Sequence, residues 1–460
     1  MKITALFLFL LLFYSCRKES FTSDPNALLR VEADTLHFDT VFSATGSITQ
    51  RVKFFNENSK GIHVSSILLK GGQSSPFKIN VNGIPGPLIN GIDIAADDSA
   101  YVFVSVTVNP TATNLPFLIR DSIEINYNGN KKMMQLQAYG QNAHFYKDKT
   151  LTASAVWNND LPYVILGGLE IEAGVKLLIN KGCKIYFHSN AALVVKGTLE
   201  VLGAKGENEK VLFTGDRLDD PYKDFPASWP GIYFLNTSKD NVINYATISN
   251  AYQAVVVQAP SVNNNPKLQL SQTVVTNAFD AGILGVNTSI KAQNLLVSNC
   301  GKNLVLVNGG EYSFTHCTIA SFSSILLRHK DPLLLLSNFL NNAPPNALNA
   351  NFKNTIIWGD TAARVEHEIV VSRNGGVSNV VFDHVLWNEK TNPVNVTNVF
   401  AAKTGYPQFD SISPAKNFYD FRLKDSSPAI NAGTNTLVTS DLDGKVRPVG
   451  LPDLGSYEEQ

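Results

Sequence analysis

Hydrophobic and polar residues alternate with a period of two between residues 28 and 145. In the stretch ITQRVKFFN, Val52 and Phe54 fall on one face, while Arg51 and Lys53 fall on the other. The stretch DSIEINYNGNKKMMQLQAYG holds two alternating runs around Asn128-Gly129, a dipeptide that suits a tight hairpin because both residues tolerate positive φ. Several short strands of this kind predict a β-sandwich over residues 28–145.

Beyond residue 146 a longer repeat appears, in the stretches ISNAYQAVVV, VTNAFDAGIL and VSNCGKNLVL. Their asparagines, Asn250, Asn277 and Asn299, are 27 and 22 positions apart, and Leu177 and Leu199 further upstream are also 22 apart. A period near 22 with short apolar strands predicts a parallel β-helix, in which successive coils stack about 4.8 Å apart. A leucine-rich repeat has a similar period, but its LxxLxLxxN pattern is absent from this chain.

Stacked coils would also explain the recurring asparagine. Equivalent side chains form rows along the axis of a β-helix, so Asn250, Asn277 and Asn299 would form a hydrogen-bonded ladder at one turn. Chance recurrence in an asparagine-rich chain is the alternative, and the shared flanking pattern argues against it.

Three stretches resemble known protein families. ALVVKGTLEVLG…VLFTG, followed by WPGIYF at Trp229–Phe234, resembles the right-handed parallel β-helix, or pectin-lyase-like, superfamily of bacterial surface proteins. The ending FRLKDSSPAINAGT…DLDGKVRPVGLPDLGSYE resembles the closing segment of such proteins. LHFDTVFSATGSITQRVKFFN through GNKKMMQLQAYGQ resembles the immunoglobulin-like domains that begin many Bacteroidetes-type surface lipoproteins.

Pattern and resemblance together predict an all-β chain. We expect an immunoglobulin-like β-sandwich over residues 28–145, a right-handed parallel β-helix over 146–400 and an irregular C-terminal cap over 401–460. A cap is expected because the end of a solenoid exposes an unpaired edge and an open core.

The N-terminus has the features of an export signal. In MKITALFLFLLLFYSC a lysine precedes a short apolar run and a small residue precedes Cys16, which predicts a lipoprotein signal peptide over residues 1–16 with lipidation at Cys16. Phe13 and Tyr14 depart from the usual lipobox, and an ordinary signal peptide is the alternative. Residues 17–27 would form a tether, and the lipid would hold the protein on the outer membrane at the cell surface.

Composition excludes some functions and leaves others open. The formal net charge of −1 gives no electrostatic reason to expect nucleic acid as a partner. Cys183, Cys300 and Cys317 lack metal-ligand spacing, so buried thiols or a Cys300–Cys317 disulfide are both possible.

The β-helix superfamily includes polysaccharide lyases and hydrolases as well as non-enzymatic adhesins, and acid–base chemistry requires titratable groups that converge. Two charged clusters are the catalytic candidates, and a solvated loop with incidental ion pairs is the alternative for each. The first cluster contains Arg328, His329, Lys330 and Asp331, and the second contains Asp360, Arg364, Glu366, His367, Glu368 and Arg373.

Other residues are candidates for ligand and metal binding. Tyr222, Trp229 and Tyr233 could stack on sugar rings, or they could pack as a small core beneath the insert that carries them. Asp441 and Asp443 begin a loop that resembles a calcium site, with Asp453 nearby, but a turn held by carboxylate hydrogen bonds is the alternative. No other cofactor is indicated.

We therefore expect a lipid-anchored surface protein that binds a glycan or a protein partner along the β-helix flank without catalysis. A lyase-like carbohydrate-active enzyme and a structural envelope component are the two alternatives.

Overall fold

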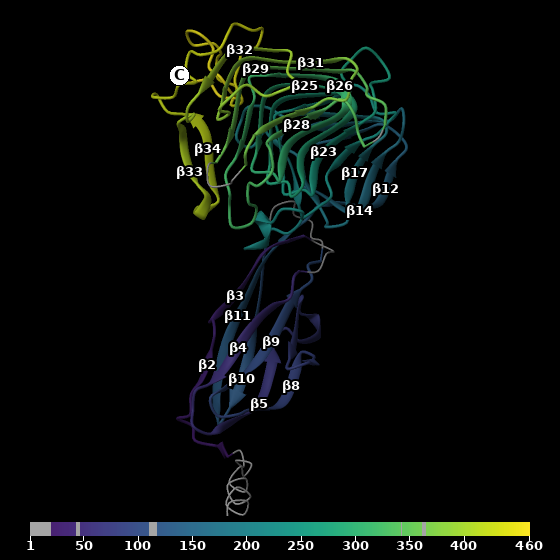
Figure 1. Cartoon of the computed structure of the whole chain (residues 1–460). Coiled ribbons are helices and arrows are strands. Elements are labelled where there is room, and N and C mark those ends of the chain that lie inside the picture. Colours follow the sequence, from purple (N-terminus) through teal and green to yellow (C-terminus); the bar gives the residue numbers. More distant parts are fainter. Residues whose placement is uncertain (1–19, 43–46, 110–116, 342, 361–364) are drawn as a thin grey trace, which may run out of the picture. The chain divides into compact units, whose positions relative to one another are not determined.

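The computed structural model describes residues 20–42, 47–109, 117–341, 343–360 and 365–460, and the chain divides into two compact units, Met1–Asn142 and Ala143–Gln460 (Figure 1). The described residues are almost all in strands and loops, with only short 3-10 turns at Gly72–Ser74, Tyr222–Asp224 and Pro414–Lys416. Among these residues we find no helix that is both long and apolar enough to cross a bilayer.

The first unit is a β-sandwich of two sheets around one hydrophobic core. Val52 and Phe54 of one sheet and Ile123 and Ile125 of the other belong to the same buried cluster, so the predicted alternation is confirmed. One sheet contains β1 (Phe21–Thr22), β5 (Gly61–Leu69), β10 (Phe117–Tyr127), β11 (Asn130–Gln141), β3 (Thr35–Phe42) and β8 (Leu88–Ile94). The other contains β2 (Leu29–Val31), β4 (Gln50–Asn56), β9 (Asp98–Val106), β6 (Phe77–Val81) and β7 (Ile84–Pro85).

The predicted hairpin is confirmed between β10 and β11. Tyr127 pairs with Asn130, and the two residues between them, Asn128 and Gly129, have φ values of 46° and 76°. These are the positive angles that a tight two-residue turn requires.

The second unit is a parallel β-helix with three faces, each a stack of parallel strands (Figure 1). The first face contains the C-terminal halves of β12 (His144–Leu151) and β14 (Tyr163–Ile171), followed by β17 (Ala192–Val195), β20 (Ile232–Phe234), β23 (Gln253–Gln258), the first parts of β25 (Ala281–Ser298) and β26 (Lys302–Thr315), β28 (Leu334–Ser337) and β30 (Ile369–Ser372).

The chain then crosses to the second face and on to the third before it begins the next coil. The second face contains β13 (Ala155–Trp157), β15 (Lys176–Asn180), β18 (Thr198–Leu202), β21 (Asn241–Asn244) and segments of β24 (Leu268–Thr276), β25, β26, β29 (Leu348–Gly359), β31 (Ser378–Trp387) and β32 (Asn398–Thr404). The third face contains β16 (Lys184–Phe187), β19 (Val211–Gly215), β22 (Ala246–Ser249), β27 (Thr318–Ser321) and the remaining segments of the longer strands.

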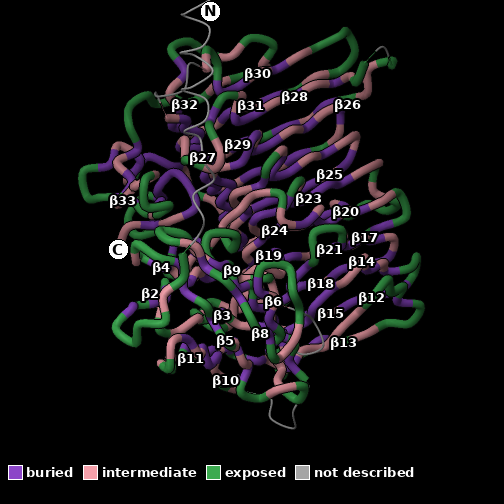
Figure 2. The backbone as a smooth tube through the Cα atoms, turned by 90° about the horizontal axis from the view of Figure 1, so that it is seen from below, coloured by how far each residue is buried: buried purple, intermediate pink, exposed green. Residues whose placement is uncertain are grey.

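Side chains that point inward fill the β-helix in rows, as the repeat predicts. Leu177 pairs with Leu199, and both are fully buried in the continuous core of this unit. Phe314, Phe352 and Phe382 stack on successive coils, with ring centroids 5.1 and 5.0 Å apart. In Figure 2 buried segments recur from strand to strand, and the exposed segments are mostly loops.

Left-handed residues mark the corners of the coils. At the corner between the second and third faces, Gln272, Asn294, His316 and Asn354 occupy equivalent positions with φ between 42° and 52°. Asparagine is the non-glycine residue that tolerates this conformation best, because its short side chain can hydrogen-bond locally. The corners therefore select asparagine for backbone reasons as well as for hydrogen bonding between coils.

The C-terminal segment lies along the flank of the β-helix. Residues 405–460 include the hairpin of β33 (Phe409–Ser413) and β34 (Phe418–Leu423), which stands beside the stacked strands in Figure 1. Phe421, Leu442 and Leu454 pack with Ile356 and Trp358 of the third face in a second hydrophobic core. This segment therefore covers one side of the coils.

A candidate binding groove on the β-helix

Polar side chains line the outer side of the second face. Across β25, β26, β29 and β31 the strand register forms two neighbouring rows of outward residues, of which five are serine or asparagine, two are charged and one is valine. One row contains Ser289, Glu311, Asn349 and Asn379, and the other contains Lys291, Ser313, Asn351 and Val381. Because successive strands lie about 4.8 Å apart, these side chains form a continuous polar floor.

Loops of unequal length turn this floor into a groove of 760 Å³. On two successive coils the chain passes from the first face to the second within a single strand, through Asn287 and Asn308 in the left-handed conformation. On the coil before and the coil after, longer connections stand out as walls, formed by residues 260–266 and by Asn346 and Ala347. The groove is thus a notch between two walls, with strands as its floor.

Buried and charge-assisted contacts fix the first wall. Lys267 is fully buried, and its ammonium donates hydrogen bonds to the carbonyls of Leu235, Asn236 and Gln258 at 3.2, 3.1 and 2.7 Å. Burial lowers the pKa of Lys267 to about 8, so the charged form still predominates at neutral pH.

The exposed part of the first wall is tied to a neighbouring coil. The carboxylate of Asp240 accepts hydrogen bonds from the side-chain amides of Asn265 at 2.8 Å and Asn263 at 3.0 Å. These two amides lower the pKa of Asp240. The loop is therefore held as a preformed wall.

Asparagine side chains fix the second wall. The amide of Asn346 donates to the side-chain oxygen of Asn308 at 3.0 Å, so the wall is attached to the tight turn on the coil before it. Fully buried Asn338 donates to the carbonyl of Gly375 at 2.7 Å and accepts from the backbone of Asn374 at 3.0 Å. Both walls are thus ordered before any ligand binds, which lowers the entropic cost of binding.

The floor, by contrast, presents side chains without partners in the described part of the chain. Lys291, Ser313, Asn351 and Asn379 make no side-chain hydrogen bond or ion pair there, whereas Glu311 accepts one bond from Asn349 at 3.1 Å. Tyr312, the aromatic ring among the lining residues, is buried and donates its hydroxyl to Gly309. The floor therefore offers amide, hydroxyl and ammonium groups rather than ring faces.

The two charged clusters proposed as catalytic candidates meet at a buried pair outside this groove. His329 Nε2 lies 2.9 Å from Glu368 Oε1, and the two side chains are 1% and 6% exposed. Arg328 and Lys330 are exposed on either side of His329. None of these four residues lines the groove.

His367 and Asp360 of the second cluster have partners other than this pair. His367 lies 3.2 Å from Glu389, which also accepts the backbone N–H groups of Glu368 and Ile369. The carboxylate of Asp360 accepts the backbone N–H of Ser323 at 2.6 Å. Arg364 lies outside the described residues.

The three aromatic candidates have different environments. Trp229 is fully buried, stacks on Phe187 with centroids 4.2 Å apart and donates its indole N–H to Ser249. Tyr233 is half-buried and donates to the carbonyl of Pro230. Tyr222 is exposed, with the guanidinium of Arg217 stacked on its ring at 4.1 Å. None of the three lines the groove.

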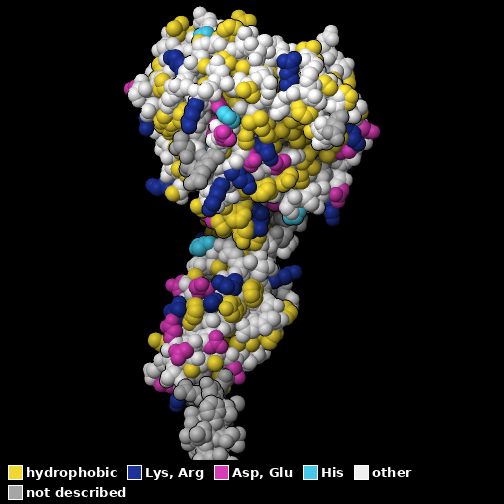
Figure 3. All heavy atoms as spheres, in the orientation of Figure 1, with side chains coloured by type: hydrophobic (Ala, Val, Ile, Leu, Met, Phe, Trp, Pro, Cys, Tyr) yellow, Lys and Arg dark blue, Asp and Glu magenta, His cyan; other side chains and the backbone are white. Residues whose placement is uncertain are grey.

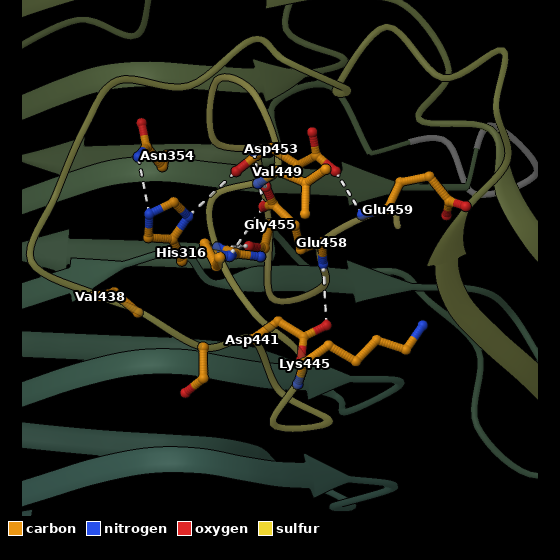
Figure 4. Close-up of polar contacts among 12 residues, drawn as sticks. His316, Asn354, Val438, Asp441, Lys445, Val449, Asp453, Gly455, Glu458 and Glu459 are labelled. Carbon is orange, nitrogen blue, oxygen red and sulfur yellow. Dashed lines mark hydrogen bonds and ion pairs between the residues drawn. The ribbon is translucent and has the colours of Figure 1, made fainter.

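Each carboxylate proposed for calcium binding has its own hydrogen-bond or ion-pair partners, and Figure 4 shows Asp441 and Asp453. Asp441 accepts the backbone N–H groups of Asp443 and Lys445, at 2.9 and 2.8 Å. Asp453 accepts those of Asn431 and Glu459, both at 2.7 Å. Asp443 pairs with Arg422 at 2.6 Å. Within the described ranges no group of three or more His, Cys, Asp or Glu is positioned to hold a metal ion.

The asparagine ladder residues stack in a single file. Their backbone N–H groups bond to the next coil in the same way, and Asn277 also donates its side-chain amide to Asn250 at 2.8 Å. Asn250 and Asn277 donate in addition to the carbonyls of Lys223 and Asp224, so the ladder anchors the insert that carries Tyr222. Asn299 accepts the backbone N–H of Phe322 instead.

The remaining predicted sites are cysteines. Cys183, Cys300 and Cys317 are buried free thiols in the structure. Cys16, the predicted lipidation site, lies outside the described residues.

Comparisons with known proteins give limited information. No family model matches the chain, and no curated protein matches it. Among solved structures, pectate lyase Pel9A is 11% identical, with 69% of this chain and 88% of that chain covered and a TM-score of 0.30. A family 123 glycoside hydrolase from Clostridium perfringens is 12% identical over 25% of this chain and 26% of its own length, with a TM-score of 0.18. The ASH/PapD-like domain 7 of human CEP192 is 10% identical over 26% of this chain and 89% of that chain, also with a TM-score of 0.18.

Proposed function

We propose that this protein binds an uncharged, hydroxyl-rich glycan in the groove on the second face of its β-helix. The observation that supports the proposal is the groove floor, where Ser313, Asn351 and Asn379 present side chains without partners in the described part of the chain. The floor lies between two walls that hydrogen bonds already hold in place. Amides both donate and accept hydrogen bonds, as sugar hydroxyls do, so a row of them matches a neutral polyol better than a charged ligand. One lysine and one glutamate in the floor leave it close to neutral.

The floor also has a regular spacing that suits a polymer. Equivalent residues on adjacent strands are about 4.8 Å apart, and residues on the same side of a strand are about 6.8 Å apart. A ligand with repeated hydroxyl groups can contact several of these positions at once. We therefore expect an extended oligosaccharide to bind more tightly than a monosaccharide.

The proposed location rests on the N-terminal sequence. Cys16 after a short apolar run supports lipidation and attachment to the outer membrane, with the groove available at the cell surface. We also assign the sandwich to the immunoglobulin-like class, which its two sheets around one core support, and the β-helix to the right-handed class, since parallel crossovers are right-handed in nearly all proteins. Turnover is not part of this proposal, because the charged clusters do not line the groove.

The test is binding of the full chain to a panel of neutral and acidic oligosaccharides. In the variant Asn349→Ala/Asn351→Ala we expect at least a tenfold loss of affinity for the best neutral ligand, because two neutral hydrogen-bonding side chains contribute about 1 kcal/mol each. The matched control is Asn398→Ala. Asn398 follows Asn351 and Val381 in the same row, is exposed and does not line the groove.

Two results would contradict the proposal. The first is equal loss of affinity in the control and the groove variant. The second is the release of unsaturated or shortened sugars during incubation, which would show that the protein is a lyase or a hydrolase.

A further inference from the structure

The outer face of the five-stranded sheet in the sandwich carries cations and aromatic rings side by side. Tyr101 and Phe103 of β9 are each 37% exposed, and their rings are stacked with centroids 6.4 Å apart. Arg51 and Lys53 of β4 lie opposite them in the register, with Lys53 paired to Tyr101 and Arg51 to Phe103. Figure 3 shows hydrophobic and cationic side chains next to one another on the visible face of this unit.

The rings hold the cations in place. The ammonium of Lys53 lies 4.9 Å from the centre of the Tyr101 ring, and the guanidinium carbon of Arg51 lies 5.5 Å from it. A cation that lies over a ring still has N–H donors that are not aimed at the ring, and these can bind a carboxylate. The ring of Tyr101 thus holds two cations next to each other on the outer face of the sheet.

The two nearby carboxylates, Glu57 and Glu32, bond to groups other than these cationic side-chain ends. Arg51, Lys53 and Lys78 form no ion pair in the described part of the chain. Glu57 pairs with Arg30 at 2.7 Å, and Glu32 accepts the backbone N–H of Lys53 at 2.9 Å. By contrast, Glu124 on the other sheet faces two lysines, Lys70 at 3.2 Å and Lys131 at 3.3 Å. Among the described residues, the other cations that lie over an aromatic ring, Arg30, Arg217 and Arg422, each form an ion pair, whereas Arg51 and Lys53 do not.

We propose that this face, defined by Arg51, Lys53, Lys78, Tyr101 and Phe103, binds an acidic polysaccharide of the polyuronate class. The cations match the carboxylates of such a polymer, and the ring edges and exposed ring surface match the apolar face of its sugars. This interaction is independent of the neutral ligand proposed for the β-helix groove. It gives the sandwich a binding role of its own.

The experiment measures binding of the full chain to polygalacturonate at low and moderate salt. We expect Arg51→Gln/Lys53→Gln to weaken binding about tenfold or more, since the variant removes two charge-assisted hydrogen bonds to carboxylates on a solvent-exposed surface. Raising the salt concentration should weaken wild-type binding and should have less effect on the variant. Thermal unfolding of each variant checks that the sandwich remains folded.

Two further variants separate this surface from general electrostatic attraction. The single variant Arg51→Gln has Arg120→Gln as its control, because Arg120 is exposed on β10 of the other sheet and its replacement removes the same charge. Only Arg51→Gln should weaken binding. Tyr101→Leu leaves the charge unchanged but removes the ring under both cations, so it should also weaken binding.

The inference is overturned if wild-type protein fails to bind polygalacturonate, or if Arg120→Gln weakens binding as much as Arg51→Gln. It is also overturned if poly-glutamate or double-stranded DNA binds as tightly, because the surface would then recognise charge alone. If the groove variant Asn349→Ala/Asn351→Ala abolishes polygalacturonate binding, the acidic polymer binds the β-helix and not the sandwich.

Discussion

The second and third faces of the β-helix are built by the same coils, yet one is open and the other is covered. On both faces the inward residues are aliphatic or aromatic and fill a common core. The outward residues differ, because the second face presents Asn349 and Asn351 where the third presents Ile356 and Trp358, only a few positions further along β29. Inward residues thus determine the coil, and outward residues determine whether a face becomes a surface or a second core.

The covering segment is stabilised mainly by apolar burial. Ile356 and Leu386 of the third face are 1% and 0% exposed beneath residues 405–460. Full burial of such a side chain contributes about 1.5–3 kcal/mol, so a few of them hold a segment that has little regular structure of its own. The outward side chains of the groove on the second face give no comparable stabilisation. Their replacement is therefore limited by ligand binding and not by folding.

A polar residue placed on the covered third face should destabilise the packing of the covering segment. We expect Ile356→Asn to lower the free energy of unfolding of unit 143–460 by about 4 kcal/mol, because it removes a buried aliphatic side chain and leaves a buried amide without partners. Chemical denaturation measures the loss, and limited proteolysis should show new cleavage within residues 405–460.

The reciprocal change, Asn351→Ile, is the control. Asn351 is exposed in the groove floor, so stability should change by less than about 0.5 kcal/mol while neutral glycan binding falls. Equal destabilisation by both variants would show that the two faces do not differ in the way we infer.

The sequence predicts the coils much better than the groove. Leu177 and Leu199 are 22 residues apart and pair as expected, because inward rows depend on a regular period. Lys291 and Ser313 are also 22 apart, but Ser313 and Asn351 are 38 apart because a long loop intervenes. A row of outward polar residues interrupted by such a loop has no fixed period, and its members are recognised only once the register is known.

The sequence predicts part of the arrangement of the two charged clusters. His329 and Glu368 belong to different clusters. They meet because Leu334, five residues after His329, pairs on the adjacent coil with Ile369, which directly follows Glu368. The sequence identified both residue types but could not show that the pair would be buried. The covering role of residues 405–460 was also hidden, since loops carry no periodic signal that would indicate which face they contact.

Two lysines at the groove have different roles, one structural and one in ligand contact. Lys267 supports a wall from inside the protein, whereas Lys291 lies exposed in the floor. We expect Lys267→Met to cost about 3 kcal/mol, since it leaves three carbonyl groups without their donor, and to weaken glycan binding because the wall loosens. Lys291→Met should weaken binding with a stability change below about 0.5 kcal/mol.

Denaturation and binding measured on the same two variants distinguish these roles. If Lys267→Met is as stable as wild type, the buried ammonium does not hold the wall. If Lys291→Met binds the neutral glycan as wild type does, the floor contact assigned to Lys291 is wrong.

The smallest expected effect concerns pH and the attachment of the covering segment. His316 is fully buried at the corner between the two faces, where it lies next to Asn354 and the backbone of Asp453 (Figure 4). Its Nδ1 faces the carbonyl of Asp453 at 3.2 Å, and its Nε2 accepts the amide of Asn354 at 3.0 Å and faces the hydroxyl of Thr436 at 3.1 Å. These partners fit a neutral ring with its proton on Nδ1.

Burial, assisted by the nearby cation of Arg447, lowers the pKa of His316 to about 2. The unfolded chain binds this proton near pH 6.5 and the folded chain does not, so the stabilising contribution is complete above pH 6.5 and is lost as the pH falls toward 2. From this group alone, unit 143–460 should lose about 2 kcal/mol of stability between pH 7.5 and pH 5.

His316→Asn tests this directly, because asparagine already occupies the equivalent left-handed corner on the coils before and after, at Asn294 and Asn354. The variant should show a pH dependence of unfolding smaller by about one proton across this range, measured by denaturation at several pH values. Every other histidine is unchanged in the variant, so the difference from wild type isolates His316. An unchanged slope would mean that the corner tolerates a charged ring, and that the covering segment is not held by a neutral His316.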